Sequence, residues 1–235
     1  EQESPLVWRR DRVPTLTVRA DVTQGVLPES VVAKIGPSIA EYNAKLVQPY
    51  RIETGGLYES SNDSSENVFS VVPMMILLML LFMMMLLISF RRLAMVVFIM
   101  PLGLIGVVGA LLLFQRPLGF VAILGILALI GMIAKNAVIL IVSIEEESAG
   151  GASVSDAVMT ACGNRLTPLV LTAISTVLGL IPIAPTIFWG PMAIAIMGGL
   201  MVASLLTLIL LPVLYITIFG REDKKSPPPA AVAAA

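Results

Sequence analysis

The sequence predicts a membrane all-α bundle of five transmembrane helices that follows a short N-terminal α/β segment. Hydrophobic residues make up 57% of the 235 residues, charged residues make up only 13%, and the mean hydropathy is +0.93. This composition is typical of polytopic membrane proteins and excludes an ordinary soluble domain. The charges are also segregated, because residues 1–66 carry acids and bases throughout while the rest is mostly apolar.

The N-terminal residues 1–67 are predicted to form a βαβ unit and a linker. Residues 15–22 alternate apolar and polar side chains, which predicts a strand. A helix is predicted over 28–46 because a proline suits its first turn, and residues 50–56 offer a second strand. Such a unit belongs to an α/β sandwich, so we expect the remainder of that sandwich to lie outside the chain. Residues 60–66 are predicted to be a polar linker to the membrane.

The membrane region is predicted over residues 68–221. Its five apolar stretches are each near the ~20 residues that a membrane-crossing helix requires, at about 68–90, 94–114, 119–144, 168–188 and 191–219. Residues 153–162 are predicted to form a short interfacial helix capped by Ser153 or Ser155. The tail, 222–235, is rich in Pro and Ala and is predicted to be disordered.

The prolines and glycines in the spans lead to two further predictions, one on helix kinks and one on helix packing. Prolines should kink their helices, at Pro101, Pro182 and Pro212. Glycines let helices approach closely, which is a common packing device in membranes, at Gly103, Gly106, Gly109, Gly179, Gly198 and Gly199.

The basic residues predict the orientation of the spans. Those near the span ends fall almost entirely on one side, at Arg91, Arg92, Arg165, Arg221, Lys224 and Lys225, with only Arg116 on the other. By the positive-inside rule the C-terminal tail is then cytoplasmic, and residues 1–66 lie outside, in the periplasm of a Gram-negative cell.

Lys135 is the principal candidate for function. It is the only charge in the stretch 125–144, about 24 Å along a helix from Gly119 and about 14 Å from Ile144. Snorkelling to either interface is difficult at that depth, so we expect burial within a helix bundle. A cation at membrane depth costs ~2.5–3.5 kcal/mol on insertion scales and usually marks an ion pathway. A structural lysine that binds a carbonyl between helices is the alternative.

The acidic partner of Lys135 is predicted to be absent from this chain. Neither 67–144 nor 157–220 contains an Asp or Glu. The polar neighbours are Asn136 on the same helix and Arg165 and Thr172 at the start of the fourth span, two helical turns apart on one face. Thr172 alone would bond a backbone carbonyl of its own helix, but with Lys135 it suggests a polar column through the bundle.

No metal, cofactor or catalytic site is predicted. The chain has no His and a single Cys, Cys162, so a His-based or multi-Cys site cannot form from it. With no acid in the spans either, an intramembrane hydrolase has no general base. Six methionines cluster in the first span, at Met74, Met75, Met79, Met83, Met84 and Met85, but they point around the helix, which favours packing over metal binding.

The order of these segments resembles the C-terminal end of resistance–nodulation–division (RND) efflux permeases of the hydrophobe/amphiphile-exporting type. The resemblance covers residues 13–221 and is most specific in GMIAKNAVILI and RLTPLVLT. It implies that the five spans are the eighth to twelfth helices of a twelve-helix permease and that 1–66 end its second periplasmic loop. The chain would therefore be a C-terminal part of a larger protein.

The resemblance also implies a mechanism driven by the proton motive force, without a cofactor. Lys135 matches a lysine that ion-pairs with two aspartates on the fourth helix, and Arg165 and Thr172 match polar residues of the eleventh helix. Asn136 follows the same motif. The implied protein partners are the N-terminal half with the Asp pair, two further copies in a homotrimer, a periplasmic adaptor and an outer-membrane channel. The implied substrates are amphiphilic compounds, and no nucleic acid is involved. The implied location is the bacterial inner membrane.

Several alternatives remain open from sequence. The chain could belong to a heavy-metal-exporting RND relative, although it shows no convergent ligands, or to a secretion-assisting or lipid-exporting one. A non-transporting assembly or sensor subunit would keep the bundle without the acidic partner of Lys135. The resemblance implies that substrate specificity lies largely in a periplasmic pocket outside this chain.

Overall fold

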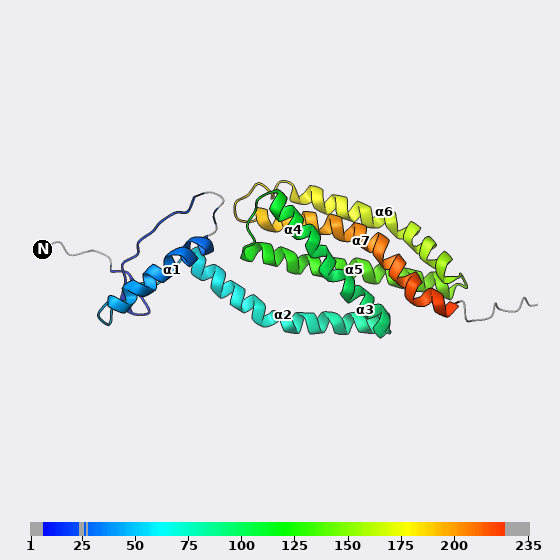
Figure 1. Cartoon of the computed structure of the whole chain (residues 1–235), viewed down its shortest axis with the longest axis horizontal. Coiled ribbons are helices and arrows are strands. Elements are labelled where there is room, and N and C mark those ends of the chain that lie inside the picture. Colours follow the sequence, from blue (N-terminus) through cyan, green and yellow to red (C-terminus); the bar gives the residue numbers. More distant parts are fainter. Residues whose placement is uncertain (1–6, 24–25, 27, 224–235) are drawn as a thin grey trace, which may run out of the picture. The chain divides into compact units, whose positions relative to one another are not determined.

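The computed structural model describes residues 7–23, 26 and 28–223. The chain separates into two compact units, with the division between Ile52 and Glu53. Figure 1 shows the elements in chain order.

The first unit contains a small hairpin and one helix. Strands β1 (Arg9–Arg10) and β2 (Val13–Pro14) pair antiparallel. Asp11 and Arg12 connect them with φ angles of 50° and 69°, the left-handed pair that a two-residue hairpin turn requires. Helix α1 (Pro28–Lys45) confirms the helix predicted over 28–46, with the proline in its first turn.

The predicted βαβ unit is wrong for the described residues. Residues 15–22 form no strand there, and Leu16 and Val18 are 90% and 87% exposed. Residues 50–56 form none either. Within them, the backbone of Ile52 bonds the side chain of Asn43: Asn43 Nδ2 donates to the Ile52 carbonyl at 2.9 Å, and the Ile52 N–H donates to Asn43 Oδ1 at 2.7 Å. An alternating sequence becomes a strand only where another strand accepts its backbone hydrogen bonds, and the described part of the chain supplies none here.

The second unit is a bundle of helices, five of which are long and apolar enough to cross a membrane. This confirms the predicted membrane helical bundle. The helices are α2 (Leu57–Leu87), α3 (Phe90–Ile99) with η1 (Met100–Leu102) and α4 (Gly103–Leu113), α5 (Phe120–Ala149), α6 (Val154–Leu180) and α7 (Gly190–Asp223). Figure 1 shows α5, α6 and α7 running along one another, α4 crossing obliquely toward α3, and α2 approaching the other helices at its C-terminal end.

Two segments predicted as separate pieces are parts of long helices. The linker expected at 60–66 lies inside α2, so this helix starts well before residue 68. The interfacial helix expected at 153–162 is the first part of α6, which continues through Pro168. Its N-cap is Ser153, whose Oγ accepts from the Asp156 N–H at 3.2 Å and donates to the Asp156 carboxylate at 2.7 Å. This reciprocal cap decides between the two serines proposed from sequence.

The prolines act differently from one another. Pro101 lies in the 3₁₀ turn η1 that separates α3 from α4, so the predicted interruption of the second span is present. Helix α6 stops at Leu180, short of the predicted 188, and residues 181–185 form turns. Pro182 and Pro185 lie in what would be the next helical turn. Because proline has no backbone N–H, neither can donate a helical hydrogen bond there. Pro212 lies within α7, which continues as helix on both sides.

Helix α7 is the centre of the packing, since it lies against α4, α5 and α6. It approaches α4 through glycine. A Cβ built on Gly198 would lie 2.8 Å from the carbonyl oxygen of Gly106 and would also clash with Ala110, and one built on Gly106 would clash with the backbone of Gly198. The tight packing predicted from glycine is therefore confirmed at these positions. It is wrong for Gly109 and Gly179, because a Cβ on either meets nothing within 4 Å.

Candidate functional site

Lys135 lies midway along α5 on the exposed side of that helix. Ala128, Gly131, Lys135 and Ile139 are all exposed and recur at intervals of three or four residues, so they form one stripe, here called the Lys135 stripe. The opposite side of α5 is packed into the bundle, with Ile133, Ala134, Ala137 and Val138 buried.

Lys135 is thus exposed among the described residues, and its expected burial within a larger helix bundle stays a prediction. The apolar side of α5 takes the contacts with α6 and α7, and the lysine is left on the outer side. Among the described residues, Lys135 makes no hydrogen bond and no ion pair. Asn136, its neighbour, is half-buried. The lysine therefore presents its charge on a surface of the bundle.

Arg165 connects α6 to α5. Its Nε donates to the Oγ of Ser143 at 2.7 Å, and Ser143 is buried while Arg165 is half-buried. Consecutive helices α5 and α6 run in opposite directions. Lys135 is eight residues before Ser143, about 12 Å along the axis, and Thr172 is seven residues after Arg165, about 10.5 Å. Lys135 and Thr172 are therefore at about the same depth in the bundle.

Thr172 bonds within its own helix. Its Oγ1 donates to the carbonyl of Pro168 at 2.7 Å, and the side chain is exposed. This is the local bond that a lone membrane threonine was expected to make. No hydrogen bond among the described residues joins Lys135, Asn136, Arg165 and Thr172 to one another. The predicted polar column has its members at suitable depths, but this chain does not connect them.

An ion pair that sequence reasoning missed holds three helices together. Arg92, in the first turn of α3, pairs through Nη1 with the carboxylate of Glu145 near the end of α5. The same nitrogen donates to the Leu87 carbonyl at 3.2 Å, and the guanidinium carbon lies 5.7 Å from the ring centroid of Phe219 on α7. Both charged side chains are about a quarter exposed. Only their common side of the membrane was evident in the sequence, because no spacing rule relates residues on separate helices.

The charges sort to the two ends of the bundle as the sequence predicts. Arg92 lies where α3 begins and Glu145 lies near the end of α5, and the Arg165–Ser143 bond lies in the same half of the bundle. Arg116 lies at the other end, since a Cβ built on Gly190 at the start of α7 would be 3.9 Å from its guanidinium carbon. Which end faces the cytoplasm stays a prediction.

Replacing Arg92 by Ala should destabilise the bundle by about 1–3 kcal/mol, because it leaves the carboxylate of Glu145 partly buried without its cation. The matched control is Lys45→Ala, which breaks the exposed Lys45–Glu41 pair on α1 at 2.6 Å and should cost less than about 0.5 kcal/mol. Thermal unfolding in detergent measures both. Equal losses for the two variants would contradict a structural role for the Arg92–Glu145 pair.

The described residues contain no group of three or more His, Cys, Asp or Glu side chains that could hold a metal ion. On α2, Met83 is buried whereas Met74 and Met85 are 58% and 74% exposed. Methionines spread around a helix in this way do not converge on one ligand position.

A family model described as the AcrB/AcrD/AcrF family matches residues 1–219. The chain belongs to this family of RND efflux permeases. It is 30% identical over 222 residues to the swarming motility protein SwrC of Bacillus subtilis (strain 168), which is 89% of this chain and 20% of that protein. It is 30% identical over 189 residues to the nickel-cobalt-cadmium resistance protein NccA of Alcaligenes xylosoxydans xylosoxydans, covering 78% of this chain and 18% of NccA.

Two further similarities bear on the fold and on the breadth of the family. The chain is 29% identical over 139 residues to the toluene efflux pump membrane transporter TtgB of Pseudomonas putida (strain DOT-T1E), covering 56% of this chain and 13% of TtgB. The crystal structure of a heavy metal efflux pump matches with a TM-score of 0.63 and 28% identity, over 82% of this chain and 19% of that one. The chain thus spans about a fifth or less of the RND relatives that it matches.

Membership in the RND family confirms the resemblance drawn from GMIAKNAVILI and RLTPLVLT, and it places the five helices in a multi-pass membrane protein of the efflux-permease class. The individual roles of Lys135, Asn136, Arg165 and Thr172 stay predictions.

Proposed function

We propose that this chain forms part of the membrane region of a proton-driven efflux permease, in which Lys135 pairs with acidic side chains on a segment outside the chain. The observation that carries the proposal is the position of Lys135. It lies at membrane depth, on an exposed stripe of a helix that is otherwise well packed, and it has no partner in the described part. A charge in that setting requires a counter-ion, and family membership supports an efflux role.

The Lys135 stripe suits the approach of another helix. Ala128 and Gly131 are small, so a neighbouring backbone can come close to α5 just beside the lysine. A pair of carboxylates on that neighbour would then lie in a low-dielectric setting opposite a fixed cation. The cation favours their ionised form, and proton uptake from one side of the membrane discharges them.

Protonation supplies the driving step in this proposal. When the carboxylates are neutral, their attraction to Lys135 is lost and α5 is free to take a second position relative to its neighbour. The Arg165–Ser143 bond ties α5 to α6, and the Arg92–Glu145 pair ties it to α3. A displacement of α5 is therefore transmitted to the rest of the bundle. Thr172 and Asn136 offer polar groups at the depth of the lysine for the proton or for water.

The proposed substrates are drugs or other amphiphilic compounds, exported by proton antiport. The names of SwrC and TtgB describe swarming motility and toluene efflux, and that of NccA describes nickel, cobalt and cadmium resistance. Metal export is the second candidate, favoured by NccA and by the heavy metal efflux pump structure. The similarity to TtgB, which is named as a toluene efflux pump, favours amphiphiles.

The proposed assembly is a homotrimer in the bacterial inner membrane. Residues 1–66 would lie in the periplasm, the tail in the cytoplasm, and a segment with the acidic pair would complete the membrane region. A periplasmic adaptor and an outer-membrane channel would extend the pump across the envelope. Family membership is the observation that supports these proposed partners.

The function is tested in energised cells that produce the complete permease containing this chain. Ethidium retention should fall when the pump is present, rise again when an uncoupler collapses the proton gradient, and stay unaffected by nickel or cadmium. Cellular nickel and cadmium, measured by mass spectrometry, should not change. Reduced cellular metal with unchanged ethidium would instead establish metal export, and no effect on either would favour a non-transporting subunit.

A further inference from the structure

Ser143 is a buried polar residue in a part of α5 that otherwise packs apolar side chains. It is 7% exposed, and Leu140 and Ile144 beside it are buried. A hydroxyl in such a place costs free energy unless it is hydrogen-bonded. Its Oγ accepts from the Nε of Arg165 on α6 at 2.7 Å. The hydroxyl is therefore bonded to a charged donor, which gives a stronger bond than a neutral one.

This bond uses only one of the three nitrogens of the Arg165 guanidinium. The two terminal nitrogens make no hydrogen bond and no ion pair among the described residues, and they keep accessible surface although the side chain as a whole is half-buried. Pro168 and Thr172, three and seven residues further along the same face of α6, are exposed. Arg165 is therefore held at Nε while its terminal N–H groups remain available to another group.

We propose that Ser143 is a positioning residue, which fixes the guanidinium of Arg165 so that its terminal nitrogens bind a carboxylate on the segment that completes the membrane region. This inference rests on the proposed function. A long side chain loses rotamer freedom when it binds, and the bond to Ser143 reduces that loss because it orders the guanidinium in advance. The planar fork of arginine matches the two oxygens of a carboxylate.

The contact at Arg165 is separate from that at Lys135. Ser143 lies eight residues beyond Lys135, which is about 12 Å along α5. The neighbouring segment then meets one cation on α5 and a second on α6, at two levels of the bundle. Ser143 bonds only the second, so it acts on proton coupling through Arg165.

The test measures ethidium-dependent proton flux in liposomes that contain the complete permease. Ser143→Ala and Ser143→Cys remove the acceptor, and each should lower the flux about tenfold, as expected for the loss of one hydrogen bond to a charged group. Cys occupies nearly the space of Ser but accepts weakly, so it separates the hydrogen bond from packing. Ser143→Thr keeps the hydroxyl and should retain at least about half of the parent flux.

A combined variant tests whether Ser143 acts through Arg165. Arg165→Lys keeps the charge but has no fork for the serine to orient, so it should lower the flux by itself. Adding Ser143→Ala to Arg165→Lys should then change the flux less than about twofold, because the two substitutions remove the same interaction. A further tenfold loss in the double variant would show that Ser143 acts elsewhere.

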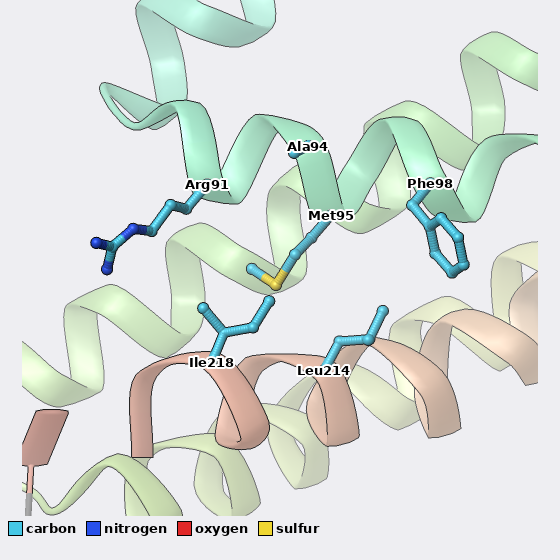
Figure 2. A pocket seen from close by; sticks show the side chains of 6 residues that line it. All are labelled: Arg91, Ala94, Met95, Phe98, Leu214 and Ile218. Atoms are coloured by element: carbon cyan, nitrogen blue, oxygen red, sulfur yellow. The ribbon is translucent and has the colours of Figure 1, made fainter. Parts of the chain in front are cut away.

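Two control variants should leave the flux unchanged. Ser204 on α7 is also 7% exposed, but its Oγ has no hydrogen bond among the described residues, so Ser204→Ala removes a buried hydroxyl without removing a bond. In Figure 2, Met95 of α3 points toward Leu214 and Ile218 of α7. Met95→Leu therefore changes an apolar contact in the same half of the bundle at nearly constant volume.

The parent protein distinguishes the two possible failures. A parent without ethidium-dependent proton flux would contradict the proposed function, and the role of Ser143 would fall with it. An active parent whose Ser143→Cys variant has normal flux would overturn the role of Ser143 alone and leave the proposed function in place. Low flux in Ser143→Thr together with normal flux in Ser143→Cys would assign Ser143 to packing.

Discussion

Replacing Lys135 by Met is expected to reduce efflux to the level of cells without the pump. The substitution keeps the length of the side chain and removes its charge, so acidic groups on a neighbouring segment lose the cation that they face. The amount of protein in the membrane should not fall. Removing a cation from the exposed stripe of α5 relieves ~2.5–3.5 kcal/mol of insertion cost, so Lys135→Met should insert at least as well as the parent.

Two comparison variants give this prediction its specificity. Lys135→Arg keeps the charge but changes its shape and hydrogen bonding, so it should retain partial efflux. Arg116→Gln removes a cation from the end of the bundle and should pump normally. Efflux of a fluorescent dye, normalised to the quantity of permease in the membrane, measures all three. If Lys135→Met pumps as well as the parent, the lysine has a structural role only.

Substituting Gly106 by Ala is expected to have the largest effect on stability for a single added methyl group. The new Cβ would clash with the carbonyl oxygen of Gly198 and lie 2.7 Å from the Cβ of Val202, and neither atom can move by a change of rotamer. Helices α4 and α7 must then separate. Overpacking of this kind costs about 1–3 kcal/mol and more where backbone must shift.

Gly109, one turn further along α4, offers the matched control. It is exposed, and a Cβ there meets nothing within 4 Å, so Gly109→Ala should stabilise the helix by about 0.5–1 kcal/mol. Thermal unfolding in detergent should therefore move in opposite directions for the two variants. Identical melting temperatures would show that α4 and α7 do not approach through Gly106.

The membrane helices could be predicted from sequence because the bilayer sets their length and composition. An apolar stretch of about 20 residues has few other stable forms, so the five spans were found even where their ends were displaced. The ends moved for local reasons. Polar residues 60–66 extend α2 instead of forming a linker, and Pro182 with Pro185 stops α6 early. The polarity of a stretch predicts whether it lies in the membrane. It does not predict the residue at which a helix begins or ends.

The N-terminal strands could not be predicted in the same way. A strand is stable only with a partner, and the alternation in residues 15–22 says nothing about where that partner lies. The Asn43 side chain, which bonds the backbone of Ile52, gives no signal in the sequence.

For the candidate site, chemistry was easier to predict than arrangement. The depth of Lys135 and the absence of Asp and Glu from the spans follow directly from residue positions. The hydrogen bond of Thr172 within its own helix follows from the usual bonding of threonine to a backbone carbonyl one turn earlier. The exposed side of α5 and the Arg92–Glu145 pair depend on how helices distant in sequence pack together. The sequence likewise does not tell which glycine lies at a helix contact, since Gly106 does and Gly109 does not.

Proton flux coupled to substrate movement tests the central claim most directly. The complete permease is reconstituted in liposomes with an imposed pH difference, and an internal pH dye records proton movement when ethidium is added. The parent should show ethidium-dependent proton flux, and Lys135→Met should show none. Undiminished ethidium-dependent proton flux in Lys135→Met would contradict the assignment of Lys135 to proton coupling.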